Sequence, residues 1–445
     1  MLTRARMSAC MILVLSLLPL APASGQTMQD VLKDLFVFGS GDDPLFLIGT
    51  AGQEATAVHG SHFIPSSSET NGALLNFFTS SVALNVANFP LSSTTASQTF
   101  KFVDGVPTPT SNSFGPIFAE RAQTIGRGRV NAGVNYSKLA FKRVRGVDLS
   151  DVQLVFLHQN ADFEGCDEIF GNDCTLLGVP PLENDIITLD LNLDMNADVF
   201  AFYGTFGLTD WLDLSLALPV INFDMRGSSV ATVIPTSDPA VHFFGGTQED
   251  PVLAAEKQAF GSATGIGDIV GRVKALIIPG ENWDFGVLAE VQAPTGREED
   301  FLGTGKWNAK GLVIISGTFS DFAPHANVGY EYRGSDLEQD VVEVIAGFDQ
   351  RLASWATLAI DLLGGFRVGD QKLKFPEDVH IQAPFERTVR VTNIPDRNDD
   401  ILDGSLGFKF RTGGGLIIIT NVLVPLNDGG LRSGVIPTLG LEYTI

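Results

Sequence analysis

Apolar side chains alternate with polar or small ones through most of this chain after Arg129, and this period-two pattern constrains the fold more than any other feature. The last thirteen residues, SGVIPTLGLEYTI, carry it clearly, with Val435, Leu439 and Tyr443 on one face. Such alternation places two kinds of side chain on the two faces of a β-strand. A strand of this kind buries its apolar face either in a soluble core or in lipid.

The pattern recurs in twelve segments, and the connections between them decide between those environments. Short connections such as Pro279–Trp283 strictly alternate with long ones such as 228–265. Outer-membrane barrels have short periplasmic turns, long outer loops and an even number of strands. The sequence therefore predicts an all-β fold, an antiparallel transmembrane β-barrel of about twelve strands. The expected strands are approximately 129–144, 186–207, 211–226, 266–278, 283–294, 308–320, 323–333, 340–352, 354–368, 401–411, 415–426 and 433–445.

Ionisable residues fall mainly on the face opposite the apolar one. A Lys or Arg that faces lipid near the midplane costs about 2–4 kcal/mol, so these charges are expected to point into the lumen. A turn near Gly280–Glu281 places Arg272 opposite or next to Glu290. The network either fills and supports a narrow barrel or lines a polar, gated pathway. Its predicted members are Asp268, Arg272, Lys274, Glu290, Glu331, Arg333, Glu343, Arg351, Asp361, Arg367, Lys409 and Arg411.

The first 128 residues lack a consistent barrel pattern. Residues 1–25 combine Arg4 and Arg6, an apolar run and small residues, which is typical of a secretory signal peptide. Residues 26–128 are interpreted as a small, partly helical plug or periplasmic segment that precedes a barrel of residues 129–445. Short helices are expected at 28–38 and 71–87, and a hairpin at 94–109. In the alternative interpretation, 98–104 and 113–122 add a strand pair and make fourteen strands.

Composition bounds the partners. Charged residues make up 18% of the chain, and its formal net charge is −23. Nucleic acid requires a basic surface, so no nucleic-acid partner is expected. A barrel implies outer-membrane lipid and the barrel-assembly machinery as partners. Acidic outer loops fit a lipopolysaccharide surface whose phosphates are bridged by divalent cations.

Few residues suggest covalent chemistry. Cys166 and Cys174, in EGCDEIFGNDC, predict a local disulfide in an oxidising compartment, and a metal site is the alternative. His158 and His325 are the candidates for a Ser–His–carboxylate arrangement. The pair His59 and His62, in HGSH, is interpreted as part of a polar loop. We expect no enzymatic activity, no cofactor and no metal site.

Three segments, Ser113–Leu139, Gly265–Ile277 and Ala293–Gly305, carry a family resemblance. They resemble an outer-membrane transporter family labelled as the MetA pathway of phenol degradation. The chain is similar, more distantly, to fatty-acid and aromatic-hydrocarbon outer-membrane channels. The resemblance implies passive uptake of small hydrophobic or aromatic compounds across the bacterial outer membrane. The alternatives are a structural or adhesive surface barrel with a filled lumen and an outer-membrane lipase or esterase.

Overall fold

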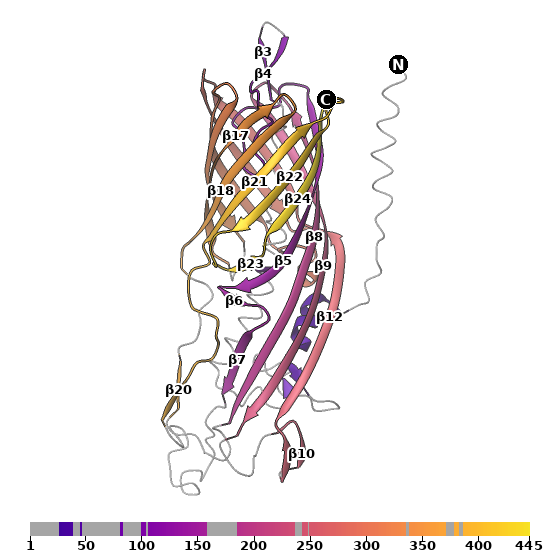
Figure 1. The fold of residues 1–445 in the computed structure, drawn as a ribbon, viewed down its shortest axis with the longest axis vertical. Helices are drawn as coiled ribbons and strands as arrows, with labels where there is room; N and C mark the ends of the chain where they lie inside the picture. The colour runs from indigo at the N-terminus through magenta and orange to yellow at the C-terminus, as the bar shows by residue number, and fades with distance from the viewer. Residues whose placement is uncertain are drawn as a thin grey trace, which may run out of the picture.

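Twelve antiparallel strands close into a barrel in the part of the chain that the computed structural model describes, namely residues 26–38, 45–46, 81–82, 99–103, 106–157, 185–235, 243–247, 249–334, 338–370, 378–381 and 386–445 (Figure 1). The last barrel strand pairs with the first, so the sheet has no open edge within the membrane. The predicted all-β barrel of twelve strands is confirmed. Its strands are β5 (Val130–Val144), β8 (Ile186–Gly207), β9 (Leu212–Ile234), β13 (Ile269–Ile278), β14 (Trp283–Ala293), β15 (Asn308–Gly317), β16 (Phe322–Arg333), β17 (Asp340–Ala353), β18 (Ala356–Val368), β21 (Ile401–Arg411), β22 (Ile417–Pro425) and β24 (Ile436–Thr444).

Three long strands continue beyond the barrel and form an extension at its long-loop end (Figure 1). They are β8, β9 and β12 (Ala254–Ile266), and β12 pairs with the distal half of β9. The prediction of a connection at 228–265 was therefore wrong over much of its length. The inward face of β12 consists mostly of small side chains such as Ala255, Ala259 and Ala263, and it also carries Lys257, so its alternation has little hydropathy contrast.

The shorter strands lie at the two ends of the barrel. Three of them, β6, β7 and β23, pair with β5 or β8 in the large sheet, and the other eight form two-stranded hairpins. The fourteen-strand alternative was wrong, because β3 and β4 pair with each other in a separate hairpin. These short strands are β1 (Val37–Phe38), β2 (Leu45–Phe46), β3 (Phe100–Val103), β4 (Val106–Pro109), β6 (Val147–Asp148), β7 (Val152–Leu157), β10 (Gly245–Thr247), β11 (Asp250–Val252), β19 (Val379–Ile381), β20 (Arg387–Val389) and β23 (Leu431–Ser433).

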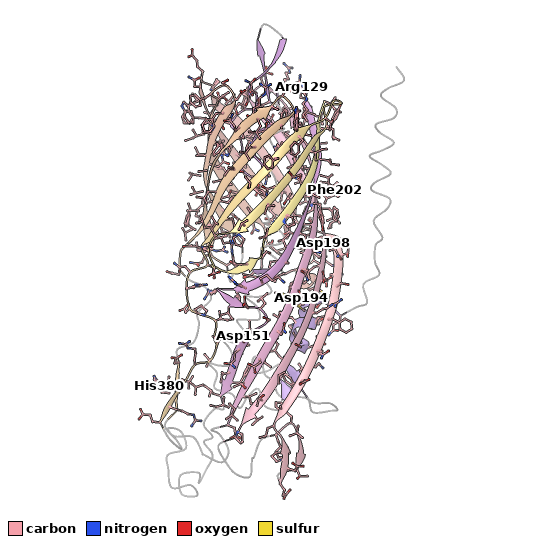
Figure 2. All side chains as sticks on the ribbon, in the orientation of Figure 1. Arg129, Asp151, Asp194, Asp198, Phe202 and His380 are labelled. Carbon is pink, nitrogen blue, oxygen red and sulfur yellow. The ribbon has the colours of Figure 1, made fainter. Side chains whose placement is uncertain are left out.

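Strand β8 reverses its polarity along its length, and this reversal locates the outer membrane interface. Its outward side chains are Asp194 and Asp198 in the extension but Phe202 within the barrel (Figure 2). The neighbouring strand changes at the same level, because Asp198 is opposite Asn222 while Phe200 is opposite Val220. The strand therefore passes from water into lipid between Asp198 and Phe200.

Aromatic side chains mark the other end of the barrel, where the turns are short. Trp211, Trp283 and Trp355 are all exposed there. Trp283 packs edge-on against Phe319, with ring centroids 5.5 Å apart, and Trp355 stacks on Phe410 at 6.0 Å. Aromatic residues favour the membrane–water interface, so this end lies at the periplasmic interface.

One helix, α2 (Met28–Asp34), packs inside the extension against β12. It begins with a capping box, in which the Thr27 hydroxyl accepts from the Asp30 backbone N–H and the Asp30 carboxylate accepts from the Thr27 N–H. Val31 and Leu35 are buried, and the Leu35 side chain fills the position that a side chain on Gly227 of β9 would take. The extension therefore buries apolar side chains in its interior, as a water-soluble domain does. Among the described residues, no helix is long and apolar enough to cross a bilayer.

Candidate functional site in the barrel lumen

Residues 113–126, called the lumen segment below, lie inside the barrel and are almost completely buried. The segment forms no strand, so its backbone N–H groups must find other acceptors. Inward-facing barrel side chains provide them. The donors and acceptors are Phe114 N to Thr357 Oγ1 (3.0 Å), Glu120 N to Asn327 Oδ1 (2.6 Å), Ala122 N to Ser316 Oγ (2.9 Å) and Ile125 N to Asp213 Oδ2 (3.1 Å).

A buried ionic cluster fixes the middle of the lumen segment. Arg121 Nη2 lies 2.6 Å from Asp349 Oδ2 on β17. His325 on β16 stands between two carboxylates, with Nε2 2.6 Å from Asp361 Oδ1 and Nδ1 3.6 Å from Asp349 Oδ1. All of these side chains are at most 3% exposed. The His325 ring is thus held by carboxylates in a structural role.

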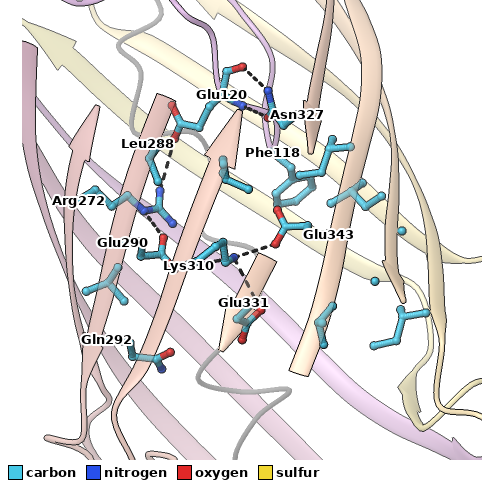
Figure 3. Close-up of a pocket in the computed structure, with 18 of the residues that line it drawn as sticks. Phe118, Glu120, Arg272, Leu288, Glu290, Gln292, Lys310, Asn327, Glu331 and Glu343 are labelled. Atoms are coloured by element: carbon cyan, nitrogen blue, oxygen red, sulfur yellow. Dashed lines mark hydrogen bonds and ion pairs between the residues drawn. The ribbon is translucent and has the colours of Figure 1, made fainter. Parts of the chain in front are cut away.

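A ladder of alternating charges runs round the lumen on the outer side of the lumen segment (Figure 3). Arg272, Glu290, Lys310 and Glu331 are directly opposite one another on β13, β14, β15 and β16. Arg272 Nε donates to Glu290, and Lys310 Nζ lies 2.8 Å from Glu343 Oε2 on β17. Lys310 is also 3.8 Å from Glu290 and 4.0 Å from Glu331. One ammonium group therefore stands among three carboxylates.

A second group of charges lies at the outer mouth, around the loop between β16 and β17. The Glu338 carboxylate is 3.3 Å from Arg367 Nη1 and 3.7 Å from Arg333 Nη1, and it accepts a hydrogen bond from Ser81. Burial raises the pKa of the Glu338 carboxyl to about 7, although the nearby Arg333 guanidinium opposes this shift. Arg145, between β5 and β6, donates to the Asp399 carboxylate through two nitrogens, at 2.7 and 2.8 Å. This ion pair joins that turn to the segment before β21.

The residues predicted to form the network divide between the lumen and its rim. Arg272, Glu290, Glu331, Arg333, Glu343 and Arg367 join the two groups described above, and Asp361 joins the His325 cluster. Lys274 lies 3.8 Å from Glu120 and 3.7 Å from Asp213, and Lys409 is buried. By contrast, Arg351 pairs with Asp321 at the short-turn end, and Arg411 is exposed there.

Asp268 joins two of the sequence segments that carry the family resemblance. It is buried directly before β13, and its carboxylate accepts from the backbone N–H groups of Gly296 (3.0 Å) and Thr304 (2.8 Å). These contacts hold the β14–β15 loop, including the short helix η3 (Glu298–Asp300), against the start of β13. Asp268 therefore positions a loop.

Several residues of the site were missed by the sequence analysis. Glu120 and Arg121 lie in a segment without strand periodicity, so no pattern assigned them an orientation. Lys310 occupies an inward position of β15 between Glu290 and Glu331, and cross-strand register was the signal that could have found it. Cys166, Cys174, His59, His62 and His158 lie outside the described residues.

A cavity of about 160 Å³ remains between the charge ladder and the lumen segment (Figure 3). The charge ladder lies on one side. The other side carries Val341, Ile345, Leu363 and Ile401, with Phe118 of the lumen segment beside them, and it also carries the carboxylates of Glu343 on β17 and Asp403 on β21. An apolar cavity of about 150 Å³ holds one benzene ring, so this cavity has room for a single-ring molecule.

The middle of the chain matches a known protein family. Residues 186–378 match the model of the family described as "Putative MetA-pathway of phenol degradation". The resemblance of this chain to the phenol-degradation family is confirmed. The match spans β8 to β18 and therefore includes the charge ladder and most of the cavity wall. No curated protein matches the chain.

Three solved structures are similar to this chain. An outer-membrane channel from Pseudomonas putida F1 has 11% identity and a TM-score of 0.41, covering 73% of this chain and 98% of its own. A FadL homologue from Pseudomonas aeruginosa has 10% identity and a TM-score of 0.31, with 72% and 89% covered. A mutant of the TodX monoaromatic hydrocarbon channel has 9% identity and a TM-score of 0.35, with 73% and 92% covered. These likenesses add nothing to the architecture that strand pairing already establishes.

Proposed function

We propose that the protein is a bacterial outer-membrane channel for the passive uptake of small hydrophobic or aromatic compounds. The observation that carries this proposal is the single-ring cavity in the lumen, which is lined by both apolar and charged side chains. Ligand sites are typically concave, with apolar walls and a few polar groups that orient the ligand. The match to the phenol-degradation family and the similarity to the TodX monoaromatic hydrocarbon channel are consistent with such cargo.

The proposed route runs along the barrel axis. Cargo is captured at the outer loops, rests in the cavity, passes the lumen segment and reaches the periplasm. Beside the cavity, β17 pairs continuously with β18, for example Val342 with Phe366, and β18 pairs continuously with β21, for example Leu362 with Gly404. This unbroken pairing argues against a lateral exit of the cargo through this wall. The lumen segment is therefore the constriction that must shift during transport.

The proposed organisation follows from this route. Residues 1–25 act as a signal peptide, residues 26–128 supply the plug, and residues 129–445 form the barrel. The lipid face contacts outer-membrane lipid, and lipopolysaccharide surrounds the acidic extension. Assembly requires the barrel-assembly machinery. No catalytic step and no cofactor enter this proposal.

The test is the flux of benzyl alcohol into vesicles whose outer leaflet is lipopolysaccharide. The native protein should raise the flux above that of protein-free vesicles. Gly365→Leu should reduce this gain, because Gly365 lines the cavity and a side chain there would extend into it from near Val341. Gly311→Leu is the matched control, because it adds the same bulk on the open lipid-facing side of β15. Equal flux in protein-free and protein-containing vesicles would refute the channel.

A structural or adhesive surface barrel is the second candidate. The buried lumen segment, held by hydrogen bonds from several strands, favours it, as does the long extension beyond the membrane. This candidate predicts that no benzyl alcohol flux exceeds the lipid background, while deletion of the extension abolishes surface attachment. The two candidates therefore give opposite results in the same vesicle assay.

A further inference from the structure

An apolar groove lies on the lipid-facing side of the barrel, over β17, β18, β21 and β22, and has a volume of about 530 Å³. Its outward side chains form two rows that cross these four strands in register. The row nearer the outer end consists of Ala346, Leu362, Gly404 and Val424, and the next row consists of Phe348, Ile360, Leu406 and Val422. Because Ala346 and Gly404 are small, the outer row is hollowed between bulkier neighbours.

A second pocket, of about 490 Å³, adjoins this groove at the long-loop end of the barrel. Val424 lines both of them, so the two form one continuous surface. The second pocket lies between β5 and the segment that connects β22 to β24. It combines exposed apolar and charged side chains, namely Leu426, Val435, Lys142, Arg143, Asp148 and Asp428. Such a mixture is typical of the boundary between lipid tails and headgroups.

Strand β5 places the second pocket at the outer membrane interface. Lys138 is directly opposite Asp198, the position at which β8 passes from water into lipid. Lys142 is exposed and lies further outward on the same face of β5. In Figure 1, β6 and β23 lie at this end of the barrel. The apolar groove therefore faces the tails of the outer leaflet, and the second pocket faces its headgroups.

The charges of the second pocket are balanced. Arg143 lies 3.0 Å from Asp148 and 3.4 Å from Asp428, and Arg432 binds Asp403. Asp148 and Asp428 are exposed and share a single guanidinium group, so their carboxylates can still accept hydrogen bonds from hydroxyl groups. The pocket therefore suits a headgroup that carries both hydrogen-bond donors and acceptors.

Lys142 supplies the cationic donor of this pocket. Its ammonium group forms no ion pair with any residue in the described part of the chain. Its stem packs over Gly434, where its Cγ lies 3.6 Å from the position that a Cβ would take. A lysine with a packed stem and an exposed head can bind a phosphate as a point charge.

We propose that the groove and the second pocket together bind one molecule of lipopolysaccharide from the outer leaflet. One acyl chain lies over Ala346 and Gly404, and a phosphate of the headgroup meets Lys142. Hydroxyl groups of its sugars donate to the carboxylates of Asp148 and Asp428. An acylated sugar phosphate thus matches both halves of the site. This inference depends on the outer-membrane location of the barrel and is independent of transport.

The test is native mass spectrometry of the full-length protein in detergent, with equal amounts of lipid A, phosphatidylethanolamine and phosphatidylglycerol added. The native protein should retain lipid A at about tenfold lower concentration than either phospholipid. Gly404→Leu should weaken this retention severalfold, because its side chain fills the groove. Its Cβ would meet Leu426 at 3.4 Å, which is an ordinary contact. Gly311→Leu is the matched control on the lipid face of β15, where a Cβ meets nothing within 4 Å.

A second variant tests the headgroup half of the site. Lys142→Gln should weaken lipid A retention about tenfold, because it removes a charged hydrogen-bond donor. Lys142 is exposed, so this variant keeps the test valid if Gly404→Leu does not fold. Lys306→Gln, at an exposed position before β15, is its matched control. Equal retention of lipid A and a phospholipid overturns the proposal, as does lipid A retention that is the same in the variants and their controls.

Discussion

Buried charges inside this barrel are tolerated because nearly all of them are placed within reach of an opposite charge. Arg121 is the clearest case, since it comes from a segment without regular secondary structure and meets Asp349 at 2.6 Å. Its neighbour Glu120 lies near Arg272 and Lys274. Two adjacent residues of opposite charge thus fasten the lumen segment to two different strands of the wall, β17 and β13.

Arg121→Ala is expected to destabilise the protein by about 3–5 kcal/mol, because it leaves Asp349 buried without its main partner. The free energy of unfolding in denaturant measures this loss. Arg143→Ala is the control, since Arg143 pairs with Asp148 at 3.0 Å on the surface, and exposed pairs contribute about 0–1 kcal/mol. Equal losses in the two variants would contradict the assigned role of Arg121.

Glu338 is expected to make stability depend on pH. Its pKa is raised by burial from 4.5 to about 7, so folding favours the protonated carboxyl. The resulting stabilisation is complete below about pH 4.5 and is lost as the pH rises through about 7. Glu338→Gln should flatten the unfolding free energy over this interval, whereas Glu299→Gln, at an exposed position, should not. An unchanged pH profile in Glu338→Gln would refute this account.

Among the elements, the lumen segment depends on close backbone approach to the barrel wall. A Cβ at Gly207, the last residue of β8, would lie 2.0 Å from the backbone oxygen of Gly126. That atom belongs to the backbone, so it cannot give way by a side-chain rotation. Glycine at this position therefore allows the end of the lumen segment to pack on β8.

Gly207→Ala is expected to loosen the end of the lumen segment, with more frequent current openings in single-channel recordings. The physical reason is the steric overlap with Gly126. Gly271→Ala is the matched control on β13, where a Cβ meets nothing within 4 Å. If both variants open equally often, the close contact does not hold the segment.

The whole molecule combines a membrane barrel and a water-exposed extension on the same strands. Within lipid the apolar side chains face outward, whereas in the extension they face inward around α2. The reversal occurs without any break in the β8–β9 pairing, between Asp198 and Phe200. Solvent thus decides which face of one continuous strand is apolar.

The position of the membrane boundary can be measured directly. Single cysteines at Phe202 and Asp194, each carrying a fluorophore, should differ in quenching by brominated lipid tails. The label at 202 should be quenched, because Phe202 is outward-facing and 41% exposed within the barrel. The label at 194 should not, because Asp194 lies in the extension (Figure 2). Similar quenching at both positions would refute the boundary.

The sequence was sufficient for the barrel strands because lipid forces a strict period of two. The expected turn position and the alternation of side chains were enough to predict that Arg272 and Glu290 lie next to each other. The observed register pairs these two residues directly. Strand β12 was missed, because its buried residues are small and its neighbours are another strand and a helix. Alternation of side chains therefore predicts a strand well only where the two faces of the strand meet strongly different environments.

The sequence by itself determined the strand pattern, the twelve-strand count and the inward direction of most charges, since each depends on local periodicity in an oily solvent. Only the tertiary structure decided how residues 113–126 cross the lumen and how Lys310 meets three carboxylates. Those contacts join residues far apart in the chain, with no periodic signal on the lumen segment. Their geometry follows from barrel closure, which brings every inward face to one axis.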